Sequence, residues 1–218
     1  MVGMVGARER IILRLIQFSE VNMINLVSGK TYLVTGGPGF LGEALIKRLP
    51  SDIKIRVLSR NEGKLILLKE KYPEIEILTG DVSDYSVCRL AMRGVTGVFH
   101  LSAFKHIGLA EKQSKECVKS NVIGSLNILE ASNLEPELRF VLAISTDKAA
   151  KISGVYGATK FLMEKLFEEY EQLNPSVEYR VIRYGNVLYS TGSVLCKWKA
   201  LLEQGMTSRH LQPKNDTR

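Results

Sequence analysis

The sequence has little cysteine and little histidine. Among its 218 residues there are three cysteines with no CxxC pair and three histidines with no HExxH-type pair. Spacings of this kind do not suit a zinc site, so we expect no metal. An odd number of widely separated cysteines predicts reduced thiols in a cytoplasmic, reducing compartment. The residues concerned are Cys88, Cys117, Cys196, His100, His106 and His210.

Long hydrophobic runs are also lacking. No stretch approaches the roughly 20 apolar residues of a membrane span. The most apolar early segment, residues 7–18, is interrupted by Arg14 and predicts a short amphipathic helix rather than a signal peptide. The formal net charge of +7, from 30 basic and 23 acidic residues, is a mild excess. Phosphate-bearing small ligands explain it as well as nucleic acid does, and we expect no nucleic-acid partner.

The middle of the chain alternates apolar strand patterns with helical patterns. This alternation predicts an α/β fold, a Rossmann-like doubly wound parallel sheet in three αβα layers, with ligands beyond the carboxyl ends of the strands. We expect a single NAD(P)-binding domain over residues 29–205, an N-terminal extension with a helical segment over 1–28, and a disordered tail over 206–218. The predicted strands cover 31–37, 53–59, 75–81, 97–103, 138–145 and 177–188, and the predicted helices 40–50, 62–72, 83–92, 117–132 and 155–173.

A glycine-rich loop follows the first predicted strand. The text "TGGPGFLG" holds Gly36, Gly39 and Gly42 at three-residue spacing, and then a helix opens. Glycine allows a tight turn and close approach to a pyrophosphate, and the free amides of a helix start face the phosphates. The motif therefore predicts a dinucleotide site that includes Phe40 and Leu41, and the alternative is a purely structural turn.

The end of the second predicted strand bears on which dinucleotide binds. An NAD site has an acidic residue here for the ribose 2′-hydroxyl. This chain has Ser59 and Arg60, and a guanidinium matches a 2′-phosphate. We therefore predict NADP, with NAD as the less favoured cofactor. Glu62 would still be able to serve a ribose, and Arg60 could be merely an exposed side chain.

Tyr156 and Lys160 form a Tyr-x-x-x-Lys pair at the start of the last predicted helix. The i, i+4 spacing places both on one face, and an ammonium near a phenol lowers the pKa of that phenol. Such a pair can accept a proton from a sugar hydroxyl while a nicotinamide accepts the hydride. Alone the pattern is a common coincidence. Asp147 and Lys148, shortly before it, have a plainer alternative as an N-capping acid and a solvated lysine.

Taken together, these motifs resemble the extended short-chain dehydrogenase/reductase superfamily, and more closely its polysaccharide-biosynthesis branch of UDP-N-acetylglucosamine 4,6-dehydratases and UDP-sugar epimerases. The resemblance runs from about residue 23 to 205 and rests on "LVTGGPGFLG", "LSRNEGK", "GDVSD", "FHLSAFKHI", "STDKA", "YGATK" and "RYGNV". The pair "SAFKH" and "STDKA" is far more specific than the glycine loop.

The resemblance implies roles for particular residues. Tyr156, helped by Thr146, would deprotonate the sugar O4, and Lys160 would hold the ribose. Lys148 would remove the C5 proton, and Asp147 would protonate the departing C6 hydroxyl before the hydride returns to C6. The remaining implied contacts are Asp81 and Val82 with the adenine, Leu101, Ser102 and Ala103 beneath the cofactor, Lys105 with cofactor and substrate, and Asn186 with the diphosphate of the UDP-sugar substrate. The family also implies a homo-oligomer.

The sequence departs from the family in three places. "AKISGV" follows "STDKA" where the family has proline and asparagine, and "KHIGLAEKQSKE" differs in a loop expected to face the sugar. The family's smaller substrate domain has no matching text after about Gly205, so we expect a truncated relative with reduced activity. Two alternatives stay open: a UDP-sugar 4-epimerase, which would not need Asp147 and Lys148, and a non-catalytic NADP-binding module.

Overall fold

A computed structural model describes residues 25–185 of the chain. The predicted early helix, the predicted tail and Asn186 lie outside the described residues. Within them, six strands form one entirely parallel sheet in the order β3-β2-β1-β4-β5-β6, the doubly wound order of the Rossmann fold. The strands are β1 (Thr31–Thr35), β2 (Lys54–Ser59), β3 (Glu76–Thr79), β4 (Val95–His100), β5 (Phe140–Thr146) and β6 (Glu178–Tyr184).

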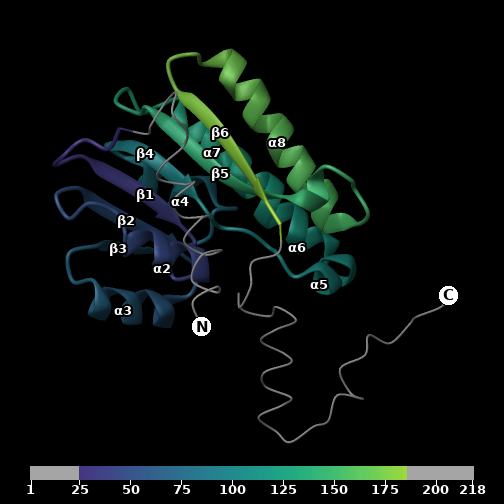
Figure 1. Cartoon of the computed structure of the whole chain (residues 1–218), viewed down its shortest axis with the longest axis horizontal. Coiled ribbons are helices and arrows are strands. Elements are labelled where there is room, and N and C mark those ends of the chain that lie inside the picture. The colour runs from purple at the N-terminus through teal and green to yellow at the C-terminus, as the bar shows by residue number, and fades with distance from the viewer. Residues whose placement is uncertain (1–24, 186–218) are drawn as a thin grey trace, which may run out of the picture.

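Helices cover both faces of this sheet (Figure 1). One hydrophobic cluster joins the sheet to α4, α7 and α8 through side chains such as Met92, Ile128 and Phe167, and a second joins it to α2 and α3 through Leu45 and Leu65. Every residue of β4 and β5 is buried, as expected for central strands covered on both faces. The helices are α2 (Phe40–Ile46), α3 (Glu62–Lys71), α4 (Tyr85–Met92), α5 (Ile107–Lys112), α6 (Ser114–Val118), α7 (Gly124–Ser132) and α8 (Val155–Leu173).

The predicted fold class is confirmed. The strands differ from their predicted bounds by a few residues at their ends, and the larger differences lie in the helices. The single helix predicted over 117–132 is wrong in detail: α6 passes into a π-helical turn, η1 (Lys119–Ile123), and then into α7. Helix α2 ends at Ile46, well before Pro50, whereas α8 has the predicted bounds. Helix α5 and the 3₁₀ turn η2 (Asp147–Ala149) were not predicted, because each is too short to show a hydrophobic period.

None of the helices in the described part of the chain combines the length and the apolar character that crossing a bilayer requires.

Candidate functional site

A pocket of about 340 Å³ lies at the carboxyl ends of the strands, around the point where the strand order reverses between β1 and β4. In doubly wound sheets ligands bind at this switch point, because the loops on either side of it diverge to opposite faces. All of the predicted cofactor residues line this pocket: Gly36, Gly39, Phe40, Leu41, Gly42, Ser59, Arg60, Asp81, Val82, Leu101, Ser102, Ala103, Lys105, Tyr156 and Lys160.

The glycine loop closes the pocket beside β1. Gly36 has a φ of 71°, a conformation that other residues rarely adopt, and a Cβ atom placed there would lie 2.9 Å from the Ser102 amide nitrogen. A Cβ atom on Gly42 would lie 2.5 Å from the Gly37 carbonyl oxygen. Both glycines are therefore needed for backbone packing. Gly39 caps α2 without a side chain, so the first amides of that helix have no capping partner from it.

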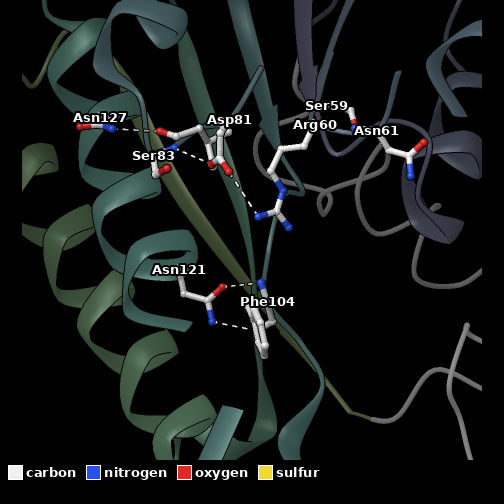
Figure 2. A network of polar contacts seen from close by, with 9 residues as sticks. Ser59, Arg60, Asn61, Asp81, Ser83, Phe104, Asn121 and Asn127 are labelled. Carbon is white, nitrogen blue, oxygen red and sulfur yellow. Dashed lines mark hydrogen bonds and ion pairs between the residues drawn. The ribbon is translucent and has the colours of Figure 1, made fainter. Parts of the chain in front are cut away.

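The exit of β2 presents a guanidinium to the pocket. Arg60 Nη1 donates to Asp81 Oδ2 at 3.2 Å, and the Ser83 amide donates to the other carboxylate oxygen at 2.9 Å (Figure 2). Burial by itself would raise the pKa of Asp81, but these hydrogen bonds and the Arg60 charge outweigh it and lower that pKa. Asp81 therefore remains a carboxylate that orients Arg60, whose side chain is 60% exposed and able to contact a ligand.

Two further lysines add positive charge on this side. Lys64 lines the pocket from the first turn of α3, whose N-cap is the Asn61 side chain, accepting from the Lys64 amide at 2.9 Å. The pKa of Lys105 is lowered by burial of its ammonium and then by the charge of Lys64. A lysine in a first helical turn opposes the helix dipole, and here it adds to a cationic wall suited to phosphate.

The segment that follows β4, Leu101 to Ala103, forms the floor of the pocket. The Ser102 amide donates to Thr35 Oγ1 at 3.1 Å, which ties the floor to the end of β1. The Asn121 side chain, from the π turn η1, pairs with both backbone groups of Phe104, accepting from its amide at 2.7 Å and donating to its carbonyl at 2.9 Å (Figure 2). The π turn therefore fixes the segment that carries Lys105.

Tyr156 and Lys160 both line the pocket from α8, as their spacing predicted, but their electrostatics differ from expectation. Burial raises the pKa of Tyr156, and the opposing hydrogen bond comes from Thr146. Lys160 is buried and donates to the Ile144 carbonyl at 2.7 Å, and burial lowers its pKa to about 8. The expected lowering of the phenol pKa by this ammonium is thus wrong for the described arrangement.

Thr146 is the last residue of β5, and Asp147 and Lys148 follow it directly in η2. None of the three lines the pocket. Lys148 Nζ donates to Asp147 Oδ1 at 3.0 Å, and Thr146 Oγ1 donates to the same oxygen at 3.0 Å. These hydrogen bonds lower the pKa of Asp147, the Lys148 bond most. An acid that protonates a leaving group needs a raised pKa, whereas in the structure without substrate these hydrogen bonds hold Asp147 as an ion-paired carboxylate.

Sequence reasoning missed several residues that line the pocket. A signal for Asn61 and Lys64 was available in "SRNEGK", where Asn61 is a good N-cap, and Tyr184 belongs to the quoted "RYGNV". Ser120 had no signal, because only the π turn brings it to the pocket. The missed residues are Pro38, Asn61, Lys64, Gly80, Ser120, Ile144 and Tyr184. Over residues 25–185 no group of three or more His, Cys, Asp or Glu side chains is arranged to hold a metal ion.

The strand order, the glycine loop and the Tyr156–Lys160 face together define the Rossmann architecture of the short-chain dehydrogenase/reductase superfamily. Residues 32–211 match the model of a family described as polysaccharide biosynthesis protein. The chain belongs to this family.

Named relatives carry two different activities. The inverting UDP-N-acetylglucosamine 4,6-dehydratase of Campylobacter jejuni is 37% identical over 200 residues, which is 88% of this chain and 59% of that protein. The UDP-glucose 4-epimerase of Rickettsia bellii is also 37% identical, over 176 residues, which is 76% of this chain and 51% of that protein. The chain thus spans between half and three fifths of these relatives.

Solved structures agree on the fold. The structure of Pen from Bacillus thuringiensis superimposes with a TM-score of 0.76 at 30% identity, over 83% of this chain and 57% of that one. The dTDP-glucose 4,6-dehydratase DesIV from Streptomyces venezuelae, determined with NAD bound, gives a TM-score of 0.69 over 81% of this chain and 63% of that one; at 21% identity it supports the fold alone.

Proposed function

We propose that the chain is an NADP-dependent nucleotide-sugar 4,6-dehydratase that acts on a UDP-N-acetylhexosamine. The observation that carries this proposal is the Asp147–Lys148 ion pair beside Tyr156: both are joined through Thr146, which contacts the carboxylate and the phenol. Elimination of water needs a base and an acid in addition to the oxidoreductase pair, and a 4-epimerase does not.

The pocket fits a dinucleotide. The glycine loop presents backbone without side chains to an approaching phosphate, and Arg60, Lys64 and Lys105 supply cations on one side. No acidic residue from the exit of β2 lines the pocket among the described residues. This absence, with Arg60 held by Asp81, favours NADP over NAD.

NADP, when bound, supplies the acceptor for a hydride from C4 and its return to C6. Tyr156, in its phenolate form, takes the proton from the C4 hydroxyl and becomes the phenol, and Thr146 orients its oxygen. The C4 ketone then acidifies the C5–H bond, so that Lys148 in its neutral form removes this proton as the C6 hydroxyl leaves. Asp147 in its protonated form gives its proton to that hydroxyl, which departs as water. As the hydride returns to C6, the Lys148 ammonium gives back the proton that C5 needs.

This scheme agrees with the lowered pKa of Asp147 once the pair is treated as a unit. A neutral Lys148 beside a protonated Asp147 has the same number of protons as the ion pair and differs only by one proton moved between the two residues. Asp147 is 56% exposed, so the ion pair is stabilised by water. A substrate that covers the pair removes this solvation, which penalises both charges and favours the neutral form.

A second candidate function is a UDP-sugar 4-epimerase, which Tyr156 and Lys160 alone would serve, and it is favoured by the Rickettsia relatives. A third is a non-catalytic NADP-binding module. Incubation of the chain with NADP and UDP-N-acetylglucosamine, followed by mass spectrometry, separates them. Loss of one water supports the dehydratase, an isomer of unchanged mass supports the epimerase, and cofactor binding without reaction supports the module.

A further inference from the structure

A continuous hydrogen-bond chain runs beneath the pocket floor. Its centre is His100, the last residue of β4, which is 1% exposed. His100 Nδ1 lies 2.8 Å from Thr35 Oγ1, and Nε2 lies 3.0 Å from Ser125 Oγ on α7. Thr35 ends β1 and is paired in register with His100, so the chain crosses the switch point of the sheet. None of the proposed chemistry uses this histidine.

The neighbours of the ring determine where its proton lies. Ser125 uses its single hydroxyl proton to donate to the Asn121 carbonyl at 2.8 Å, so towards His100 it accepts, and Nε2 is protonated. The neutral ring has one N–H, so Nδ1 accepts from the Thr35 hydroxyl. Thr35 Oγ1 in turn accepts from the Ser102 amide at 3.1 Å.

The result is one direction of donation through five groups, from the Ser102 amide to Thr35, His100, Ser125 and the Asn121 carbonyl. Burial lowers the pKa of His100 to about 3, and the nearby Lys160 charge acts in the same direction. The ring is therefore neutral at ordinary pH, and only one of its two tautomers satisfies every partner.

Both ends of this chain reach groups that border the pocket. Thr35 precedes Gly36, whose backbone lies close to that of Ser102. A Cβ atom added to Gly36 would come within 2.9 Å of the Ser102 nitrogen. At the other end Asn121 holds Phe104 and donates to Thr159 Oγ1 at 3.0 Å, one turn of α8 after Tyr156. The hydrogen-bond chain thus connects the glycine loop, the pocket floor and the helix that carries Tyr156 and Lys160.

We propose that His100 is a positioning residue, a connector of fixed tautomer that holds the glycine loop and the Ser102 floor at the separation a dinucleotide requires. This inference rests on the proposed dinucleotide function. A histidine that merely satisfies buried hydroxyls would contribute to stability without a specific effect at Ser102 or on cofactor affinity.

A matched pair of serines on α7 tests the proposal. Ser125 and Ser132 are both buried, and each donates to a backbone carbonyl, Ser125 to one of the preceding π turn and Ser132 to one of α7 itself. Ser132 also contacts Tyr179, away from the pocket. We expect Ser125→Ala to weaken NADP binding about fivefold, the size of one lost hydrogen bond, and to speed hydrogen exchange of the Ser102 amide. Ser132→Ala leaves both measurements at the wild-type value.

Thr35 provides a second comparison, with rescue by a conservative change. Thr35→Val removes the hydroxyl between Ser102 and His100 and weakens binding about tenfold or more, because two hydrogen bonds are lost. Thr35→Ser retains the hydroxyl and restores affinity. We expect nitrogen NMR of the wild-type His100 ring to show a protonated Nε2 and an unprotonated Nδ1.

Three results would overturn the proposal: a proton on Nδ1, equal effects of the two serine substitutions on Ser102 exchange, or cofactor affinity that is unchanged in Ser125→Ala. If the wild-type chain binds no dinucleotide, the cofactor part of the proposed function fails by itself. The tautomer and the Ser102 exchange then still decide whether the chain of hydrogen bonds sets the floor.

Discussion

Arg183 and Glu164 form a two-pronged ion pair that joins β6, the outermost strand of the sheet over residues 25–185, to the helix α8. Arg183 Nε donates to Glu164 Oε1 at 2.8 Å, and Nη2 donates to Oε2 at 2.5 Å. The Glu164 side chain is 7% exposed, whereas Arg183 is half exposed. Glu164 follows Lys160 by one helical turn, so this pair fixes the part of α8 that borders the pocket.

Removal of Arg183 leaves a buried carboxylate without its cation. We expect Arg183→Ala to lower the free energy of unfolding by about 2 kcal/mol, below the range for fully buried pairs because Arg183 itself contacts water. Arg180→Ala is the control, since its pair with Glu178 on the same strand is exposed and contributes at most about 0.5 kcal/mol. Urea unfolding measures the change in the free energy of unfolding for both variants. Equal losses would mean that the burial of Glu164 is unimportant.

The proposed preference for NADP over NAD makes Arg60 the residue to test. We expect Arg60→Ala to weaken NADP binding about 10- to 100-fold, the range for a lost charge-assisted contact, and NAD binding much less. Lys69→Ala on α3 is the control, because Lys69 bonds the Ile75 carbonyl and does not line the pocket. Calorimetry with NADP and with NAD gives the ratio of the two affinities for each variant. Tighter binding of NAD than of NADP by the wild-type chain would contradict the assignment.

In the proposed reaction the elimination step depends on Lys148. Lys148→Ala is expected to abolish loss of water from the sugar nucleotide while NADP affinity is retained, because the base is removed and the pocket lining is not. Lys151→Ala, an exposed lysine in the same loop, should leave both unchanged. Mass spectrometry measures the loss of water from the sugar nucleotide, and calorimetry measures the NADP affinity. Loss of NADP binding by a folded Lys148→Ala variant would instead make Lys148 a cofactor ligand.

Acid stability depends on His100. Its folded-state pKa of about 3 lies below the ordinary 6.5, so between these values the unfolded chain binds a proton that the folded chain does not. Stability is therefore lost as pH falls through this window, by up to about 1.4 kcal/mol per pH unit from this residue. His100→Gln should flatten the pH dependence of unfolding, and His106→Gln, at an exposed site, should not. Parallel curves for both variants would refute the assignment.

Several features of the fold were readable from local sequence. The strand patterns, the glycine loop and the bounds of α8 follow from hydrophobic periodicity and from the special conformations of glycine, which are properties of neighbouring residues. The residues around Arg60, Asp81 and Tyr156 meet because parallel strands end at one edge of a sheet. Alternation along the sequence already predicts that geometry.

Other features depend on contacts between distant residues. The π turn exists where Asn121 pairs with Phe104, 17 residues earlier, and no helical period reveals it. The direction of the Tyr156 pKa shift depends on burial and on which hydrogen bonds form, so the spacing of Tyr156 and Lys160 alone gave the wrong sign. The orientation of His100 likewise required its two hydroxyl neighbours.

The pocket collects residues from Gly36 to Tyr184, at the ends of strands that are far apart in the chain. No single hairpin or helix pair contains it, so it exists only when the sheet is assembled across its switch point. A dinucleotide that binds there recognises the completed fold and stabilises it by mass action, by about 2.7 kcal/mol at a ligand concentration 100 times the Kd. The same ligand can therefore serve as a reporter of correct folding during expression and refolding of the chain.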